Sequence, residues 1–130
     1  MRCNTTLIAV LVYFILSSKK LIKREYMKGF YLTLAFLGLF IPYGVLAPWI
    51  SAHGLDIPLL FSHAAANSVS QFAWLDVLVS AVALIGFILV DGRRKQIKYR
   101  YLAVIGTLIV GVSFGLPMYL YLRERAEEEI

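Results

Sequence analysis

Asp76 and Ser80 are polar residues inside an otherwise apolar run that begins at Phe72. Their spacing places both on one face of a helix. If the run crosses a membrane, burying a carboxylate there costs free energy, so Asp76 is expected to have a functional or structural role. Asp76 can carry a proton, bind a ligand or make a structural hydrogen bond to a neighbouring segment. A single acid forms no proton pathway, so the pattern favours the structural role, with the shared face pointing into a helix bundle.

Two histidines and a second acid lie in the stretch before that run: His53, Asp56 and His63. These side chains can converge as metal ligands or as an acid and a base. Their spacing matches no metal-binding motif, so neither a metal site nor a catalytic residue is predicted. No histidine lies within the long apolar runs, so axial ligands for a transmembrane haem are missing and no cofactor is expected.

Prolines and glycines interrupt the apolar runs. Pro42 and Pro117 each remove a backbone hydrogen bond, which predicts kinks and frees the carbonyls of Gly38 and Ser113. Freed carbonyls can bind ions or substrates, but neighbouring groups or water satisfy them more often. Small residues that let helices approach closely recur in the last run, at Gly106, Gly111 and Gly115. They predict a helix contact, either within this chain or with another chain.

Other chemistry is scarce. The basic residues Arg93, Arg94 and Lys95 follow the second long apolar run and predict an anchor that can also bind anionic lipid headgroups. The single cysteine, Cys3, excludes an internal disulfide. No phosphate-binding loop, nucleophile–base pair or zinc signature is present in the sequence. The chain is therefore not expected to be an enzyme.

Composition indicates the class of protein. Of the 130 residues, 60% are hydrophobic and 16% are charged, whereas soluble domains have about 45–50% and about 25%. A disordered chain is excluded, and a soluble domain of this size could not bury so much apolar surface. The net charge of +5 lies in short clusters beside apolar runs and forms no basic stripe with interleaved aromatics on a polar face, so nucleic acid is not an expected partner. The expected partner is the lipid bilayer.

Three apolar runs are long enough to cross a bilayer as helices, at about 29–49, 72–90 and 101–122. They are continuously apolar and do not alternate, which excludes a β-barrel. Asp56 and Pro58 predict the start of a short helix in the outer interface. The predicted fold is therefore an all-α integral membrane protein, a bundle of three transmembrane helices with a short external interfacial helix.

A capping box of Ser68 and Gln71 predicts where the second span begins. After the third span, Arg123 with Glu127 and Arg125 with Glu129 have the i,i+4 spacing of helical ion pairs, so this helix is expected to continue past the lipid.

Lysine and arginine predict the orientation, because they collect in cytoplasmic loops. They precede the first span and fill the loop 91–100, but the loop 50–71 contains none. The chain is therefore expected in a bacterial plasma (inner) membrane, with loop 91–100 cytoplasmic and loop 50–71 external. Three spans place the C-terminus outside as well, although Arg123 and Arg125 argue against this.

Residues 1–26 are predicted as an N-terminal extension, and residues 27–130 as a single membrane domain. The extension joins the apolar segment 7–16 to a basic cluster. Its apolar segment is too short for a comfortable span, and no cleavage site follows it. It can be a short anchor, an interfacial segment or the product of a start assigned too early. The sequence from Met27 resembles a natural beginning and favours the last alternative.

Five stretches taken together are distinctive: GLFIPY from Gly38, HGLDIP from His53, DVLVS from Asp76, DGRR from Asp91 and GVSFGLP from Gly111. Through them the chain resembles an uncharacterised bacterial family, domain of unknown function 2834. The resemblance implies a small multi-pass membrane protein. It implies no activity, so no catalytic residue is carried over from it.

Three functions remain open. The favoured one is a non-enzymatic accessory or assembly component that packs on partner helices or forms a homo-oligomer. The alternative is a ligand-binding or transport module with an external-side site of Asp76, Ser80, His53, His63 and Asp56. The third is an enzyme that modifies a lipid or isoprenoid, with Asp76 as the acid and a histidine as the base.

Overall fold

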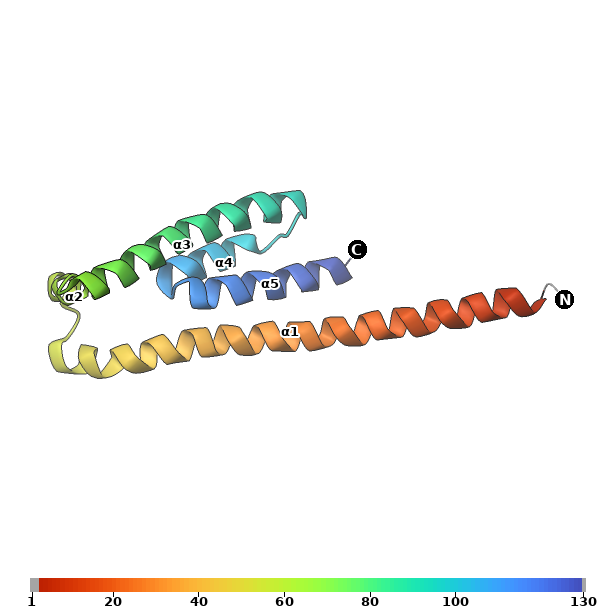
Figure 1. Ribbon diagram of the computed structural model, residues 1–130, viewed down its shortest axis with the longest axis horizontal. Coiled ribbons are helices and arrows are strands. Elements are labelled where there is room, and N and C mark those ends of the chain that lie inside the picture. The colour runs from red at the N-terminus through yellow and green to blue at the C-terminus, as the bar shows by residue number, and fades with distance from the viewer. Residues whose placement is uncertain (1–2, 130) are drawn as a thin grey trace.

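The computed structural model describes residues 3–129, and over this range the chain is helical and contains no strand. The helices are α1 (Cys3–His53), α2 (Ile57–Ala64), α3 (Ser68–Arg94), α4 (Arg100–Ile109) and α5 (Val112–Glu128). Figure 1 shows α1 running the length of the molecule, with α3, α4 and α5 beside its second half. The predicted all-α fold is confirmed. Residues 1 and 2 of the predicted extension lie outside the described residues.

Helix α1 is one continuous helix of 51 residues. The basic cluster 19–28 does not interrupt it, because lysine, arginine and glutamate are good helix formers. The apolar segment 7–16 therefore continues into the first predicted span as a single rod, about 76 Å long at 1.5 Å per residue. Pro42 lies inside this rod without ending it. The first half of α1 extends beyond the other helices (Figure 1), and its apolar side chains are exposed.

The short helix α2 begins as the sequence predicts. The N–H of Leu59 donates to Oδ1 of Asp56 over 3.0 Å, and Pro58 lies in the first turn, where its missing N–H costs no helical hydrogen bond. Figure 1 places α2 at the end of the molecule where α1 finishes and α3 begins.

Helix α3 begins at Ser68, but the predicted capping box is wrong. Asn67 is the N-cap, and its Oδ1 accepts a hydrogen bond from the N–H of Ser70 over 2.9 Å. Gln71 instead reaches back to the residues before the helix and donates through Nε2 to the carbonyl of Ala65. An asparagine cap and a serine cap satisfy the same orphan N–H groups, so the sequence alone does not choose between these neighbouring residues.

The segment 101–122 is not a single helix. Helix α4 ends at Ile109, α5 begins at Val112, and the two fold back on each other as a hairpin (Figure 1). Gly111 makes the turn with φ 120° and ψ −179°, a conformation that is essentially restricted to glycine. Within the described residues, α1 and α3 are the two helices long and apolar enough to cross a membrane. The predicted third span is not confirmed.

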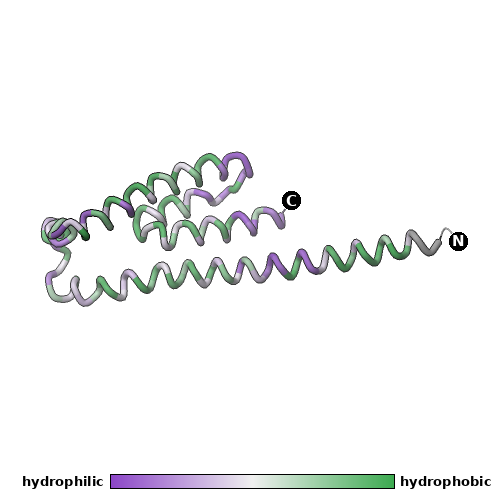
Figure 2. Tube along the Cα trace, in the orientation of Figure 1, coloured by the Kyte–Doolittle hydropathy of each residue, from purple (hydrophilic) through white to green (hydrophobic). Residues whose placement is uncertain are grey.

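The packed core lies between α3, α4 and α5. It consists of Leu84, Ile88, Ile97, Ala103, Tyr119 and Leu122. Helix α1 packs along α5 and buries Ala35. Figure 2 shows hydrophilic residues gathered in the α3–α4 loop, at the end of α5 and in a band across α1, with apolar residues over most of the remaining helix length.

Candidate functional site

His53 and His63 lie together where the end of α1 meets α2. Their ring centroids are 6.1 Å apart and the rings are nearly perpendicular. Trp49 contacts both, since its ring stacks on His53 at 5.0 Å and lies edge-on to His63 at 5.9 Å. Both histidines are exposed. We call these three residues the outer cluster.

Hydrogen bonds in the outer cluster assign the protons of the neutral imidazoles. The indole N–H of Trp49 can only donate, and it reaches Nδ1 of His63 over 3.2 Å, so neutral His63 carries its proton on Nε2. Nδ1 of His53 lies 3.1 Å from the carbonyl oxygen of Trp49, which can only accept, so this Nδ1 is protonated. The outer cluster therefore offers one accepting nitrogen, Nε2 of His53, and one donating nitrogen, Nε2 of His63.

A metal site would need further ligands. Asp56, the nearest acid in the sequence, is engaged as the cap of α2. Across the described part of the chain, no group of three or more His, Cys, Asp or Glu residues is placed to hold a metal ion. The outer cluster is suited instead to a ligand that presents both a hydrogen-bond donor and an acceptor.

Asp76 does not point into the bundle. It is exposed on α3, and it makes no hydrogen bond or ion pair with any residue from 3 to 129, whereas Ser80 is half-buried. Helix α3 buries only Leu84, Ile88 and Gly92, all in its second half. Asp76 therefore lies outside the packed part of the bundle, and the predicted site is not assembled as one unit.

The carbonyls freed by the two prolines are occupied by packing. Ser113 Oγ donates to the carbonyl of Gly38 over 3.0 Å, the oxygen that loses its helical partner at Pro42. The carbonyl of Ser113, freed by Pro117, lies so close to Gly38 that a Cβ there would collide with it. The two proline gaps thus face each other across α1 and α5. They join the two helices, and Gly38, Pro42, Ser113 and Pro117 also line an open hollow of about 390 Å³.

The predicted glycine contact lies within this chain. The ring of Phe114 covers Gly106, and the side chain of Thr107 covers Gly115, so both glycines allow α4 and α5 to approach. Nothing lies within 4 Å of the position that a Cβ of Gly111 would take, so Gly111 makes no such packing contact within the described residues. It serves the turn instead.

Glu127 joins several elements at the basic end of the bundle. Its carboxylate accepts a hydrogen bond from Lys95 Nζ over 2.8 Å and pairs with Arg24 of α1 at 3.5 Å. The predicted pair with Arg123 is confirmed at 3.7 Å. The hydrogen bond from Lys95 lowers the pKa of Glu127 below its ordinary value. The bonds to Arg24 and Lys95 join residues far apart in the chain, so no helical spacing in the sequence indicates them.

The C-terminal end of α5 lies beside the basic loop, at the same end of the bundle. Besides the Glu127–Lys95 pair, Tyr119 donates to Asp91 Oδ2 over 2.7 Å, and Glu128 pairs with Lys28 at 2.6 Å. This differs from the prediction that the C-terminus and loop 91–100 lie on opposite sides. The reason is the turn at Gly111, which returns α5 to the end from which α4 started.

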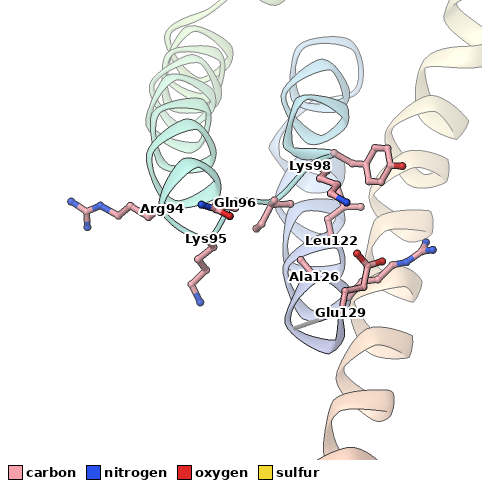
Figure 3. A pocket seen from close by; sticks show the side chains of 10 residues that line it. Arg94, Lys95, Gln96, Lys98, Leu122, Ala126 and Glu129 are labelled. Carbon is pink, nitrogen blue, oxygen red and sulfur yellow. The ribbon is translucent and has the colours of Figure 1, made fainter.

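Of the three residues predicted to bind lipid headgroups, two line one pocket and the third does not. Arg94 and Lys95 line a pocket of about 400 Å³ between the α3–α4 loop and the end of α5, shown in Figure 3. Arg93 is exposed and lies outside the lining of that pocket. The same pocket receives Lys98 and Arg125, which no sequence motif singled out.

Neither a curated protein nor a solved structure matches the chain significantly. A family model described as a protein of unknown function, DUF2834, matches residues 30–125. The match covers the second half of α1 and nearly all of the bundle, and it confirms the resemblance seen in the sequence. The chain therefore belongs to the DUF2834 family.

Proposed function

We propose that the chain is a small integral membrane protein in which α1 and α3 cross the bilayer and the α4–α5 hairpin enters and returns on one side. Only 6% of the most apolar window of α1 and 11% of that of α3 are buried within the chain. The central helix of a soluble protein would be mostly buried, so these exposed apolar faces suit lipid or other helices. Residues 27–130 are proposed as the membrane domain.

The charges support an orientation for this domain. Every lysine and arginine after Arg2 falls in the segments 19–28, 93–100 and 123–125, and Glu127 ties the three together. The hairpin brings Arg123 and Arg125 to this basic end, so they no longer oppose the rule that cytoplasmic segments are positive. We propose that the basic end, with the C-terminus, faces the cytoplasm of a bacterial inner membrane and that α2 faces outward.

We further propose that the protein is a non-enzymatic accessory or assembly component that binds a partner membrane protein. The observation that carries this is the length of α1, because a bilayer crossing needs about 20 residues and α1 has 51. On the N-terminal side of the basic cluster, Leu11 and Phe14 are 51% and 69% exposed, respectively. An apolar rod of this kind in the cytoplasm needs a protein surface to cover it.

The test is native mass spectrometry of the C-terminally tagged chain extracted in mild detergent. We expect a defined partner at fixed stoichiometry, which is lost in Leu11→Glu/Phe14→Glu. The matched control Lys19→Glu/Lys20→Glu changes exposed residues of the same helix and should retain the partner. A monomer or homo-oligomer alone, equal loss in both variants, or an intact mass that begins at Met27 contradicts the proposal.

The outer cluster favours a second function, the binding of a small ligand on the external side. Its two free imidazole nitrogens have opposite hydrogen-bonding character, and Trp49 supplies an aromatic face. The same mass spectra test it, since a discrete bound mass should disappear in His53→Ala and in His63→Ala but persist in Asp76→Asn. Asp76 makes no hydrogen bond or ion pair with either histidine within residues 3–129, so the acid and the base of the lipid-modifying enzyme are not paired there.

A further inference from the structure

The pocket at the basic end is bordered by flexible cations around an apolar floor. Ile97 and Leu122, which are 2% and 8% exposed, respectively, form the floor. Lys98, Arg94 and Arg125 line the pocket and are exposed. Figure 3 shows Lys98 lying over Leu122, while the guanidinium of Arg94 extends outward from the end of α3. The pocket thus combines an apolar surface with positive charge.

These three cations differ from their neighbours in forming no ion pair within the described residues, so the predicted pair of Arg125 with Glu129 is wrong. Arg24, Lys28, Lys95 and Arg123 all pair with carboxylates. Among the described residues, Arg94, Lys98 and Arg125 have no ion-pair partner, and the one acid in the lining is Glu129. Because no acid holds the three cationic groups, they can turn towards a bound anion without breaking an ion pair. The lining keeps a net positive charge.

The frame of the pocket is fixed by bonds that do not involve these cations. Lys95 is held by Glu127 over 2.8 Å, and the N–H of Ile97 donates to the carbonyl of Gly92 over 2.9 Å. Gln96, between them, has a φ of 53°, so the chain turns sharply after α3. A pre-formed frame with mobile cationic arms suits a charged group that arrives from outside.

We propose that this pocket binds a phosphate group, as presented by an anionic phospholipid of the cytoplasmic leaflet. The cations meet the phosphate, and the ring of Tyr99, which lines the pocket and is 64% exposed, lies against the apolar part of the lipid beside it. This rests on the proposed membrane location, which puts the basic end at the headgroup level. A soluble phosphate offers the same charge without an apolar part, so the two sources are separable by experiment.

The competing explanation is that the cations serve the helix ends. Arg94 closes α3, and Arg125 lies in the last turn of α5, where positive charge offsets the helix dipole. That role predicts a loss of stability when they are replaced, with no change in lipid selectivity. Lys98 lies in the loop, outside either helix, and is not explained in this way.

The test uses the full chain in phosphatidylcholine nanodiscs that contain a minority of phosphatidylglycerol. Native mass spectrometry measures the ratio of the two lipids retained, and a parallel titration of the detergent-solubilised protein with inorganic phosphate tests the soluble source. Arg94→Gln/Lys98→Gln/Arg125→Gln should lower the selectivity for phosphatidylglycerol by up to about a hundredfold, since each of the three cations contributes about fivefold. The control Lys19→Gln/Lys20→Gln/Lys23→Gln removes the same charge from exposed positions of α1 outside the pocket, so it should lower the selectivity clearly less than the pocket variant does.

Each outcome separates the ideas. A selective loss in the pocket variant supports the lipid site, whereas saturation by inorganic phosphate with no lipid preference replaces the lipid by a soluble anion. Equal losses in the two variants, or a pocket variant that loses stability but keeps its selectivity, overturn the site. Failure of the wild-type chain to enter pure phosphatidylcholine nanodiscs refutes the proposed membrane location instead.

Discussion

Replacing Gly38 by alanine should loosen the docking of the hairpin on α1. The added Cβ would collide with the backbone carbonyl of Ser113, which cannot rotate away as a side chain could. Gly44 lies on the same helix six residues later, and nothing lies within 4 Å of its Cβ position. Gly44→Ala is therefore a control with the same chemical change and the same helix, but without the collision.

The comparison of the two variants isolates the collision. Alanine is favoured over glycine within a helix by roughly 0.5–1 kcal/mol, and this gain is common to both. Overpacking costs about 1–3 kcal/mol. Separation of α1 from α5 also weakens the hydrogen bond between Ser113 and the carbonyl of Gly38, which is worth about 0.6 kcal/mol in a membrane protein. The difference between the variants should be about 2–3 kcal/mol, a change of roughly 30–150-fold in the docking equilibrium.

Docking can be measured by energy transfer between dyes on exposed positions of α1 and α5 during titration with sodium dodecyl sulfate in mixed micelles. Gly38→Ala should lose transfer at a lower detergent fraction than the wild type, and Gly44→Ala at an equal or higher one. If the two variants undock at the same detergent fraction, α1 and α5 do not meet at Gly38. In that case the two proline gaps do not face each other either.

Four further results are expected. Ser113→Ala should weaken docking by about 0.6 kcal/mol. The effect should be smaller in a Pro42→Ala background, because the restored N–H of residue 42 satisfies the carbonyl of Gly38 within α1. Additive effects in this double-mutant cycle contradict the hydrogen bond between Ser113 and Gly38. Gly115→Ala, which pushes against the side chain of Thr107, should open the hairpin, measured as a loss of energy transfer between dyes on α4 and α5. Glu127→Gln should weaken docking by less than about 1 kcal/mol, because the carboxylate is partly exposed. Since the folded-state pKa of Glu127 is lowered, its contribution is complete above the ordinary glutamate pKa of about 4.3 and is lost as the pH falls below it; a Glu127→Gln variant with the same acid sensitivity as the wild type argues otherwise. A reporter fused to the C-terminus should register the cytoplasm, and an external signal refutes the returning hairpin.

The local elements of the fold are predictable from the sequence, but the path of the last segment is not. Long apolar runs predict helices wherever they occur, and the cap at Asp56 follows from local hydrogen bonding. Hydropathy, however, counts 101–122 as one span whether it runs straight or folds back. The deciding residue, Gly111, is visible in the sequence, yet a glycine permits a positive φ without requiring it.

One candidate site is also predictable from residues close in the sequence, and the other is not. His53 and His63 follow each other closely in the sequence, and one short loop and helix bring them together. The phosphate pocket depends on Arg125 reaching the end of α3, and this follows from the hairpin turn rather than from any nearby motif. Likewise, Lys28 and Glu128 are 100 residues apart, a distance across which no periodic pattern carries information.

The hairpin also determines the order in which the molecule can be assembled. Helix α4 has 10 residues, too few to cross a bilayer, and α5 carries several charges in its second half, so neither can be inserted as an independent span. Helix α1 is synthesised first but packs along α5, so its main partner emerges from the ribosome last. In the proposed membrane arrangement, α1 and α3 would until then lie in the lipid without the element that joins them. Shortening α5 should therefore leave two inserted but unjoined helices, a substrate for membrane quality-control proteases.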